Sequence, residues 1–188
     1  LHDFPFNRLS MGIQSFDENE LKFLGRRHSA RQAIDSVAAC QQNGFDNISI
    51  DLMYGLPNQT IEIWEKNLHQ AIALDVQHIS AYHLIYEDHT RLEALRWNGK
   101  VHAVDEELSN QMFLLLIERL TENGFEHYEI SNFAKNGLYS QHNTAYWRDE
   151  KYLGLGPAAH SFDGQNRSWN VASLTRYIEA INSGTLPS

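Results

Sequence analysis

The first 85 residues alternate between segments with strand periodicity and segments with helical periodicity, and this alternation limits the possible folds more than any other feature. Three segments alternate apolar and polar side chains, as half-buried strands do: residues 7–13, 47–53 and 78–84. Between them, residues 30–43 and 60–74 carry apolar side chains at helical spacing. Strands separated by helices are typical of repeated βα units, so the pattern predicts a parallel sheet.

The pattern changes after residue 85. Helices are predicted over residues 90–97 and 105–123, followed by a short strand candidate over 127–130. Residues 132–167 are rich in glycine and polar side chains and show little periodicity, and a last helix is predicted over 174–182. The chain therefore divides into a βα part and a second part that mixes helices with short strands, and no low-complexity linker separates the two.

Composition narrows the class of protein. The 188 residues carry 15 Lys and Arg against 24 Asp and Glu, a net charge of −9, which argues against general nucleic-acid binding. Hydrophobic residues make up 42%, enough for a packed core, and no window approaches the ~18 apolar residues of a transmembrane span.

A single cysteine, Cys40, excludes an internal disulfide and fits a reducing compartment, so we expect a cytoplasmic protein. Because the chain begins at Leu1 without a signal-peptide pattern, we also expect a fragment of a longer protein.

Polar side chains occur where the predicted strands end, the place where ligands bind in parallel βα folds. Gln14 ends the first strand and offers amide donors and an acceptor, whereas Asp51 on the second strand accepts hydrogen bonds from a ribose diol or a cation. Arg26 follows the short helix after the first strand and suits a carboxylate. Together they indicate a site for a zwitterionic, nucleoside-like ligand. The alternative is that Gln14 and Asp51 cap loops and Arg26 forms a surface ion pair.

The segment 142–147, HNTAYW, joins an imidazole, an amide and two aromatic rings. If it is helical, His142 and Tyr146 share one face, which suits a flat aromatic ligand with His142 as an axial ligand to iron. The alternative is an aromatic packing cluster. Elsewhere, His83 and His89 near a strand end are better explained as polar groups at a cleft rim than as metal ligands. No spacing indicates a catalytic triad or paired carboxylates, so we assign no catalytic residue and no metal site.

Six longer motifs occur in order along the chain: NRLSMGIQSF, NISIDLMYGLPNQT, HISAYHL, HYEISNFA, HNTAYW and YLGLGPAAHS. This series resembles the oxygen-independent coproporphyrinogen III oxidase-like radical SAM proteins, and within them the heme chaperone branch. The resemblance covers essentially the whole chain. It implies an α/β fold that forms part of a (β/α)6 partial barrel of the TIM-barrel type, binding S-adenosylmethionine and a [4Fe–4S] cluster. By motif matching, it implies that Gln14, Arg26, Asp51 and Ile85 contact S-adenosylmethionine.

The chain departs from the family pattern in one large respect. The family's cluster motif, Cys-x3-Cys-x2-Cys, is absent, and Cys40 matches none of its cysteines. The resemblance therefore implies that residues 1–88 are the last three βα strands of the barrel, without the cluster-binding strands, and that residues 89–188 are a mainly helical α+β C-terminal region. We expect this chain alone to be inactive as an enzyme, with the cluster bound only by the full-length protein.

The resemblance implies a fragment of a radical SAM heme chaperone, related to the enzymes of anaerobic heme biosynthesis, with His142 of the HN-x-x-YW motif as the heme-ligand candidate. Its partners would be heme or a porphyrinogen and the proteins that accept the heme, with no nucleic acid and no transmembrane segment. The alternative is a true oxygen-independent coproporphyrinogen III oxidase, an oxidoreductase that uses S-adenosylmethionine and a 4Fe-4S cluster to decarboxylate coproporphyrinogen III to protoporphyrinogen IX.

Overall fold

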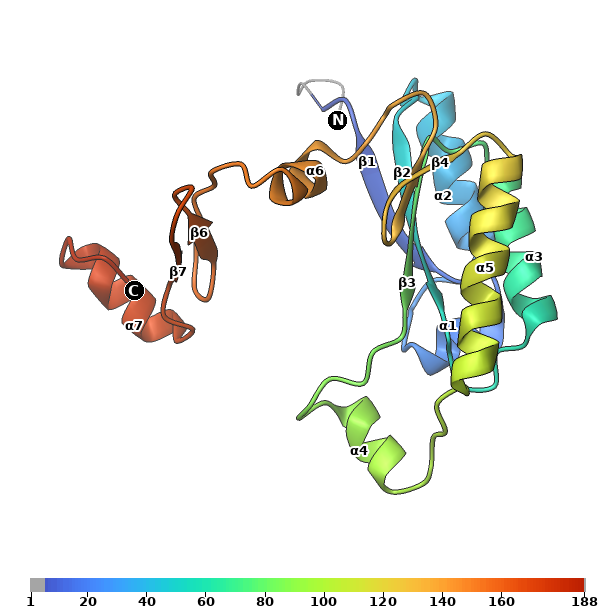
Figure 1. The fold of residues 1–188 in the computed structure, drawn as a ribbon, viewed down its shortest axis with the longest axis horizontal. Helices are drawn as coiled ribbons and strands as arrows, with labels where there is room; N and C mark the ends of the chain where they lie inside the picture. The colour runs from blue at the N-terminus through green and yellow to red at the C-terminus, as the bar shows by residue number, and fades with distance from the viewer. Residues whose placement is uncertain (1–5, 188) are drawn as a thin grey trace. The chain divides into compact units, whose positions relative to one another are not determined.

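The computed structural model describes residues 6–187 and divides the chain into two compact units, Leu1–Tyr139 and Ser140–Ser188 (Figure 1). The first unit contains a five-stranded sheet and five helices, and the second contains a two-stranded sheet and two helices. Each unit has its own internal packing, and the site predicted at the strand ends lies wholly in the first.

The sheet of the first unit has the order β1-β2-β3-β5-β4. Its strands are β1 (Leu9–Gln14), β2 (Ile48–Tyr54), β3 (His78–His83), β5 (Asn132–Ala134) and β4 (Glu126–Glu129). The first three pair in parallel, which confirms the predicted βα units. Strand β5 was not predicted; it pairs antiparallel with both β3 and β4 and so extends the sheet beyond its parallel part.

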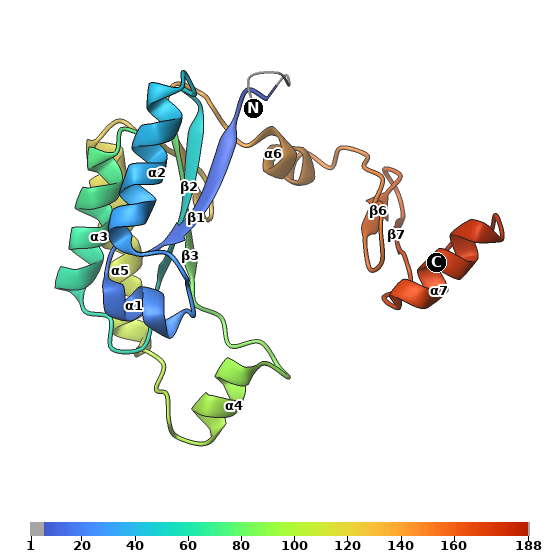
Figure 2. The same ribbon diagram turned by 180° about the vertical axis from the view of Figure 1, so that it is seen from behind.

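Helices α2, α3 and α5 cover one face of this sheet, as the two opposite views show (Figures 1 and 2). The helices of the unit are α1 (Glu18–Phe23), α2 (Ala30–Gln42), α3 (Ile61–Ala73), α4 (Arg91–Trp97) and α5 (Glu106–Glu122). They lie within one or two residues of their predicted bounds. Their N-caps explain where they start: the side chains of Ser29 and Thr60 accept backbone hydrogen bonds at the starts of α2 and α3.

The core lies between the sheet and these helices. Ile48, Ile50 and Leu52 of β2 are fully buried there, together with Trp64 of α3 and Leu116 of α5. Burying one such aliphatic side chain stabilises the fold by roughly 1.5–3 kcal/mol. Because side chains alternate along a strand, the residues between these apolar positions point to the opposite face of the sheet. That opposite face therefore carries the polar side chains that form the candidate site.

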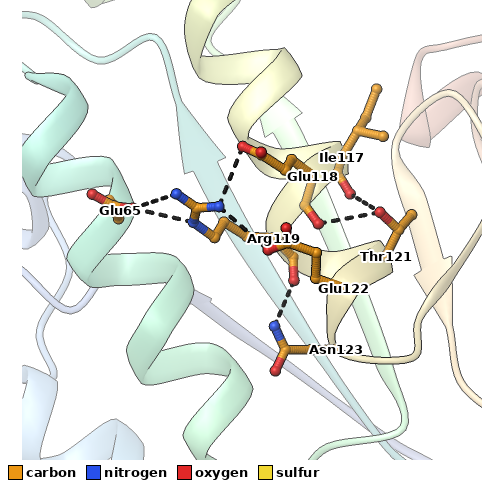
Figure 3. Close-up of polar contacts among 7 residues, drawn as sticks. All are labelled: Glu65, Ile117, Glu118, Arg119, Thr121, Glu122 and Asn123. Atoms are coloured by element: carbon orange, nitrogen blue, oxygen red, sulfur yellow. Dashed lines mark hydrogen bonds and ion pairs between the residues drawn. The ribbon is translucent and has the colours of Figure 1, made fainter.

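An ion-pair network joins the outer surfaces of α3 and α5 (Figure 3). Arg119 of α5 places its Nη2 2.9 Å from Oε1 of Glu65 on α3, and it also pairs with Glu118 and Glu122 of its own helix. Partly exposed pairs of this kind are screened by solvent and contribute little to stability. The network therefore links the two helices at the surface, while their buried apolar side chains hold them together.

The second unit contains α6 (Gln141–Trp147), the antiparallel pair β6 (His160–Phe162) and β7 (Arg167–Trp169), and α7 (Leu174–Asn182). Within its glycine-rich stretch, Gly154 has no room for a side chain, because a Cβ there would clash with the carbonyl oxygen of His160. Among the described residues, no helix combines the length and apolar character needed to cross a membrane.

The contact division falls after Tyr139, whereas the family pattern suggested a division at residue 88. Residues 89–139 pack with the first unit because α5 contributes Met112, Leu116 and Leu120 to its core and because β5 pairs with β3. The division into a barrel half and a C-terminal region at residue 88 stays a prediction about the organisation of the whole protein.

Candidate ligand-binding site

Three of the predicted site residues converge on Gly12, at the carboxyl end of β1. A Cβ at Gly12 would lie 2.8 Å from Nε2 of Gln14, 3.0 Å from Nη2 of Arg26 and 3.8 Å from Oδ2 of Asp51. The Arg26 guanidinium also donates a hydrogen bond of 3.1 Å to the Gly12 carbonyl. We use the name Gly12 hollow for the place beside Gly12 where the ends of these three side chains meet. The structure thus brings the side chains of Gln14, Arg26 and Asp51 together at one place, and their binding role stays a prediction.

Gln14 reaches the hollow because the backbone bends at the end of β1. Its φ is +74°, in the left-handed region that non-glycine residues seldom adopt. The pairing of β1 with β2 also shifts between Met11 and Gln14, so that Gln14 lies opposite Leu52. Irregularities of this kind re-aim a side chain at the end of a strand. Strain of this kind is typical of functional sites, where the surrounding structure holds it in place.

Asp51 on β2 faces the hollow from the neighbouring strand, and it is half-buried. Burial raises the pKa of its carboxyl group, and two neighbours act against that rise: a hydrogen bond with Ser80 and the positive charge of Arg26. Ser80 lies directly opposite Asp51 in the β2–β3 pairing. The sequence reasoning missed Ser80, although its place one strand across from Asp51 follows from the parallel register.

Ile85 follows the end of β3 and its side chain is 68% exposed. The preceding residue, Leu84, still donates a backbone hydrogen bond of 2.9 Å to Tyr54, which holds this segment beside the end of β2. The exposed side chain has room to contact a ligand, but no described contact brings it together with Gln14, Arg26 and Asp51. Its assignment stays a prediction.

His142 lies in the second unit, near the start of α6. Residues 141–147 are helical, which is the condition under which His142 and Tyr146 were predicted to share one face. Their rings meet edge to face with centroids 4.9 Å apart, and the Tyr146 ring packs on Tyr152 at 4.6 Å. His142 is exposed at the edge of this aromatic group, with an imidazole that a ligand can reach. Both the ligand role and the packing role remain compatible with this geometry.

Cys40 lies on α2, half-buried against the core. An iron–sulfur cluster needs several cysteine thiolates, and the sequence has one cysteine. Among residues 6–187, no group of three or more His, Cys, Asp or Glu side chains is placed to hold a metal ion. The donors present in this chain therefore do not fit a [4Fe–4S] cluster.

Sequence analysis did not predict a second polar cluster, on the face of the sheet that α2, α3 and α5 do not cover. His78 at the start of β3 is 1% exposed, and its two ring nitrogens lie 2.8 Å from Ser49 Oγ and 2.8 Å from Tyr128 Oη. Burial, followed by the nearby charge of Arg8, lowers the pKa of His78 to about 3. No local signal predicts this, because the partners come from three separate strands.

The donors around the Gly12 hollow match a zwitterion attached to a nucleoside. A guanidinium binds a carboxylate, an aspartate accepts hydrogen bonds from ribose hydroxyls or an ammonium group, and a carboxamide both donates and accepts. Gly12 itself is exposed, so these side chains meet at the protein surface. These residues fit S-adenosylmethionine, which carries all of those groups.

Comparison with known proteins identifies related chains. A family model for the Radical SAM superfamily matches residues 1–71. The chain is 39% identical over 187 residues to the heme chaperone HemW of Bacillus subtilis (strain 168), covering 100% of this chain and 49% of that protein. It is 44% identical over 154 residues to the mitochondrial radical S-adenosyl methionine domain-containing protein 1 of Bos taurus, covering 82% of this chain and 35% of that protein.

The fold is also similar to a solved structure. Coproporphyrinogen III oxidase (HemN) from Escherichia coli, described as a radical SAM enzyme, superposes with a TM-score of 0.77 at 21% identity, over 97% of this chain and 45% of that one. This likeness confirms the predicted α/β fold, which the chain shares with part of that structure. The whole of this chain matches HemW of Bacillus subtilis, but it spans only about half the length of that protein.

Proposed function

We propose that this chain is part of a radical SAM heme chaperone, a protein that binds heme and hands it to acceptor proteins in the cytoplasm. The observation that carries the S-adenosylmethionine part of the proposal is the convergence of Gln14, Arg26 and Asp51 on the Gly12 hollow. The relatives named heme chaperones at 33–39% identity support the heme part.

In this proposal the first unit supplies one side of an S-adenosylmethionine site. Arg26 holds the methionyl carboxylate and Asp51 accepts hydrogen bonds from the ribose hydroxyls, while Gln14 binds the polar groups between them. Ile85 provides an apolar contact beside the adenine. Bound next to an iron–sulfur cluster, S-adenosylmethionine is a source of radical chemistry. The cluster ligands belong to the full-length protein, and the residues of this chain bind and orient the ligand.

Replacing Gly12 with alanine tests the site directly. The new Cβ would occupy the hollow and press on the Gln14 amide and the Arg26 guanidinium, which are the ends of flexible side chains. We therefore expect folding to be retained and the affinity of the full-length protein for S-adenosylmethionine to fall by about tenfold or more. Isothermal titration calorimetry measures the affinity, and thermal unfolding checks the fold.

Gly99→Ala is the matched control. Gly99 has a φ of +65° and a Cβ there would meet nothing within 4 Å, so this variant loses some stability without touching the hollow. We expect its affinity for S-adenosylmethionine to equal that of the wild type. A Gly12→Ala protein that binds as tightly as the wild type would remove the hollow from the proposed site.

His142 is the heme-ligand candidate in the second unit. We expect heme titrated into the full-length protein to give a shifted Soret band, and the His142→Ala variant to lose both that shift and most of the affinity, because an axial imidazole bond is removed. His102→Ala is the control, since His102 is another exposed histidine outside the second unit. Equal spectra and equal affinities in wild type and His142→Ala would exclude His142 as the ligand.

Coproporphyrinogen turnover separates the chaperone from the oxidase alternative. The likeness to HemN concerns the fold and leaves this chemistry open. A chaperone with its cluster loaded binds heme and leaves the propionate groups of coproporphyrinogen III intact. Formation of vinyl groups and release of carbon dioxide by the full-length, cluster-loaded protein would replace the chaperone proposal with the oxidase.

A further inference from the structure

A buried polar network begins at Ser15, the residue that follows Gln14. Ser15 is fully buried, Glu20 is 6% exposed and Asn67 is 2% exposed. The Ser15 hydroxyl contacts Oε2 of Glu20, and the same oxygen accepts a hydrogen bond of 2.9 Å from the Asn67 amide. These three residues come from the loop after β1, from α1 and from α3, so the network joins three elements at one point.

The backbone of the loop is held by the same side chains. The amide of Phe16 donates to Asn67 Oδ1 at 2.7 Å, and the amide of Asp17 donates to Ser15 Oγ at 2.9 Å. Gln14, one residue earlier, keeps the left-handed φ of +74° that aims its side chain at the Gly12 hollow. An unusual backbone conformation persists only when its surroundings hold it, and the described network supplies that hold on the carboxyl side of Gln14.

A buried carboxyl group at this position is costly. Burial raises the pKa of Glu20, and the hydrogen bonds from Ser15 and Asn67 offset part of that rise. An apolar side chain of similar volume would often serve stability as well or better. The carboxyl group is therefore explained by the geometry that it imposes, because a single oxygen receives both Ser15 and Asn67 and so sets the path of the loop between them.

We propose that Glu20 is a positioning residue for ligand binding, which acts through Ser15 to hold Gln14 in the conformation that reaches the Gly12 hollow. This inference rests on the proposed function, because it takes S-adenosylmethionine as the ligand. Glu20 is 6% exposed, and its carboxyl group contacts Ser15 and Asn67.

A double-mutant cycle tests whether Glu20 acts through Gln14. S-adenosylmethionine affinity is measured by calorimetry on the full-length protein for Glu20→Ala, Gln14→Ala and the double variant. We expect Glu20→Ala to weaken binding by about tenfold in the wild-type background and by less than about twofold in the Gln14→Ala background, since positions that act through a shared backbone segment are coupled. A purely structural loss would weaken binding by the same factor in both backgrounds and would overturn the proposal.

Two further variants separate positioning from loss of stability. Asp105→Ala removes the N-cap of α5, away from the hollow, so it lowers stability and leaves the affinity unchanged. Glu20→Gln keeps the shape and one acceptor oxygen, so we expect it to recover most of the affinity that Glu20→Ala loses. Glu20→Gln and Glu20→Ala proteins with the same affinity as the wild type would also overturn the proposal.

The cycle also distinguishes the two proposals from each other. If Gln14→Ala alone leaves the affinity for S-adenosylmethionine unchanged, the proposed site fails. If Gln14→Ala weakens binding and Glu20→Ala does not, the site stands and the positioning role fails. Amide hydrogen exchange in the ligand-free protein gives an independent readout: we expect Glu20→Ala to speed exchange at Phe16 and Asp17, whose amides the network holds.

Discussion

Lowering the pH from 7 to 5 is expected to remove about 2 kcal/mol of unfolding free energy through His78 alone. The pKa of His78 is lowered to about 3 in the folded state, with burial as the main cause and the charge of Arg8 as the second. In the unfolded chain an ordinary histidine titrates near pH ~6.5. The unfolded state therefore takes up a proton first, and stability is lost as the pH falls below that value, in the direction of the folded pKa.

The measurement is urea unfolding at several pH values between 7 and 5, compared between the wild type and His78→Gln. Burial raises the pKa of the carboxyl groups of Glu20 and Asp51, so their contribution has the opposite sign, gaining stability as the pH falls. Both groups are unchanged in the variant, so the difference between the two slopes isolates His78. Equal slopes would show that His78 is not held neutral by burial between Ser49 and Tyr128.

Gly55→Ala is expected to destabilise the first unit by about 3 kcal/mol. Gly55 has a φ of +71°, and a Cβ there would clash with Nε2 of the His83 ring and lie 2.6 Å from its Cδ2. The ring cannot easily move away, because it packs edge to face on Tyr54 at 5.2 Å. The cost is the sum of left-handed strain and overpacking at the carboxyl ends of β2 and β3.

Gly25→Ala separates the two costs. Its φ of +66° is similar, and a Cβ there would meet nothing within 4 Å, so we expect only the strain, about 1 kcal/mol. A cycle of Gly55→Ala with His83→Ala should show a favourable coupling, since removing the ring relieves the clash. Chemical denaturation gives all the values, and equal losses for Gly55→Ala and Gly25→Ala would rule out the contact with His83.

The elements with long, regular periodicity were predictable. The alternation in β2 and the helical spacing in α2 reflect burial of one face, which the sequence records residue by residue. Strand β5 and the β6–β7 pair were not predicted, because three-residue strands are too short to show a period. They form where a longer partner strand or a hairpin supplies the hydrogen bonds, which is a property of the tertiary structure.

The candidate site divides in the same way. The rule that parallel strands present their carboxyl ends at one edge was enough to select Gln14 and Asp51, because it depends on the order of elements. The burial of Glu20 beneath that edge left no trace in the local pattern. A glutamate in a short helix has the same sequence signature whether it faces water or Ser15.

The sequence by itself determined the βα order, the family motifs and the residue types available for ligand binding, since each of these follows from short-range spacing. Only the tertiary structure decided that three side chains surround Gly12, that His78 is buried between Ser49 and Tyr128, and that Glu20 holds the loop behind Gln14. The physical reason is that pKa values, close approaches and buried hydrogen bonds depend on partners far apart along the chain, which only the folded packing brings together.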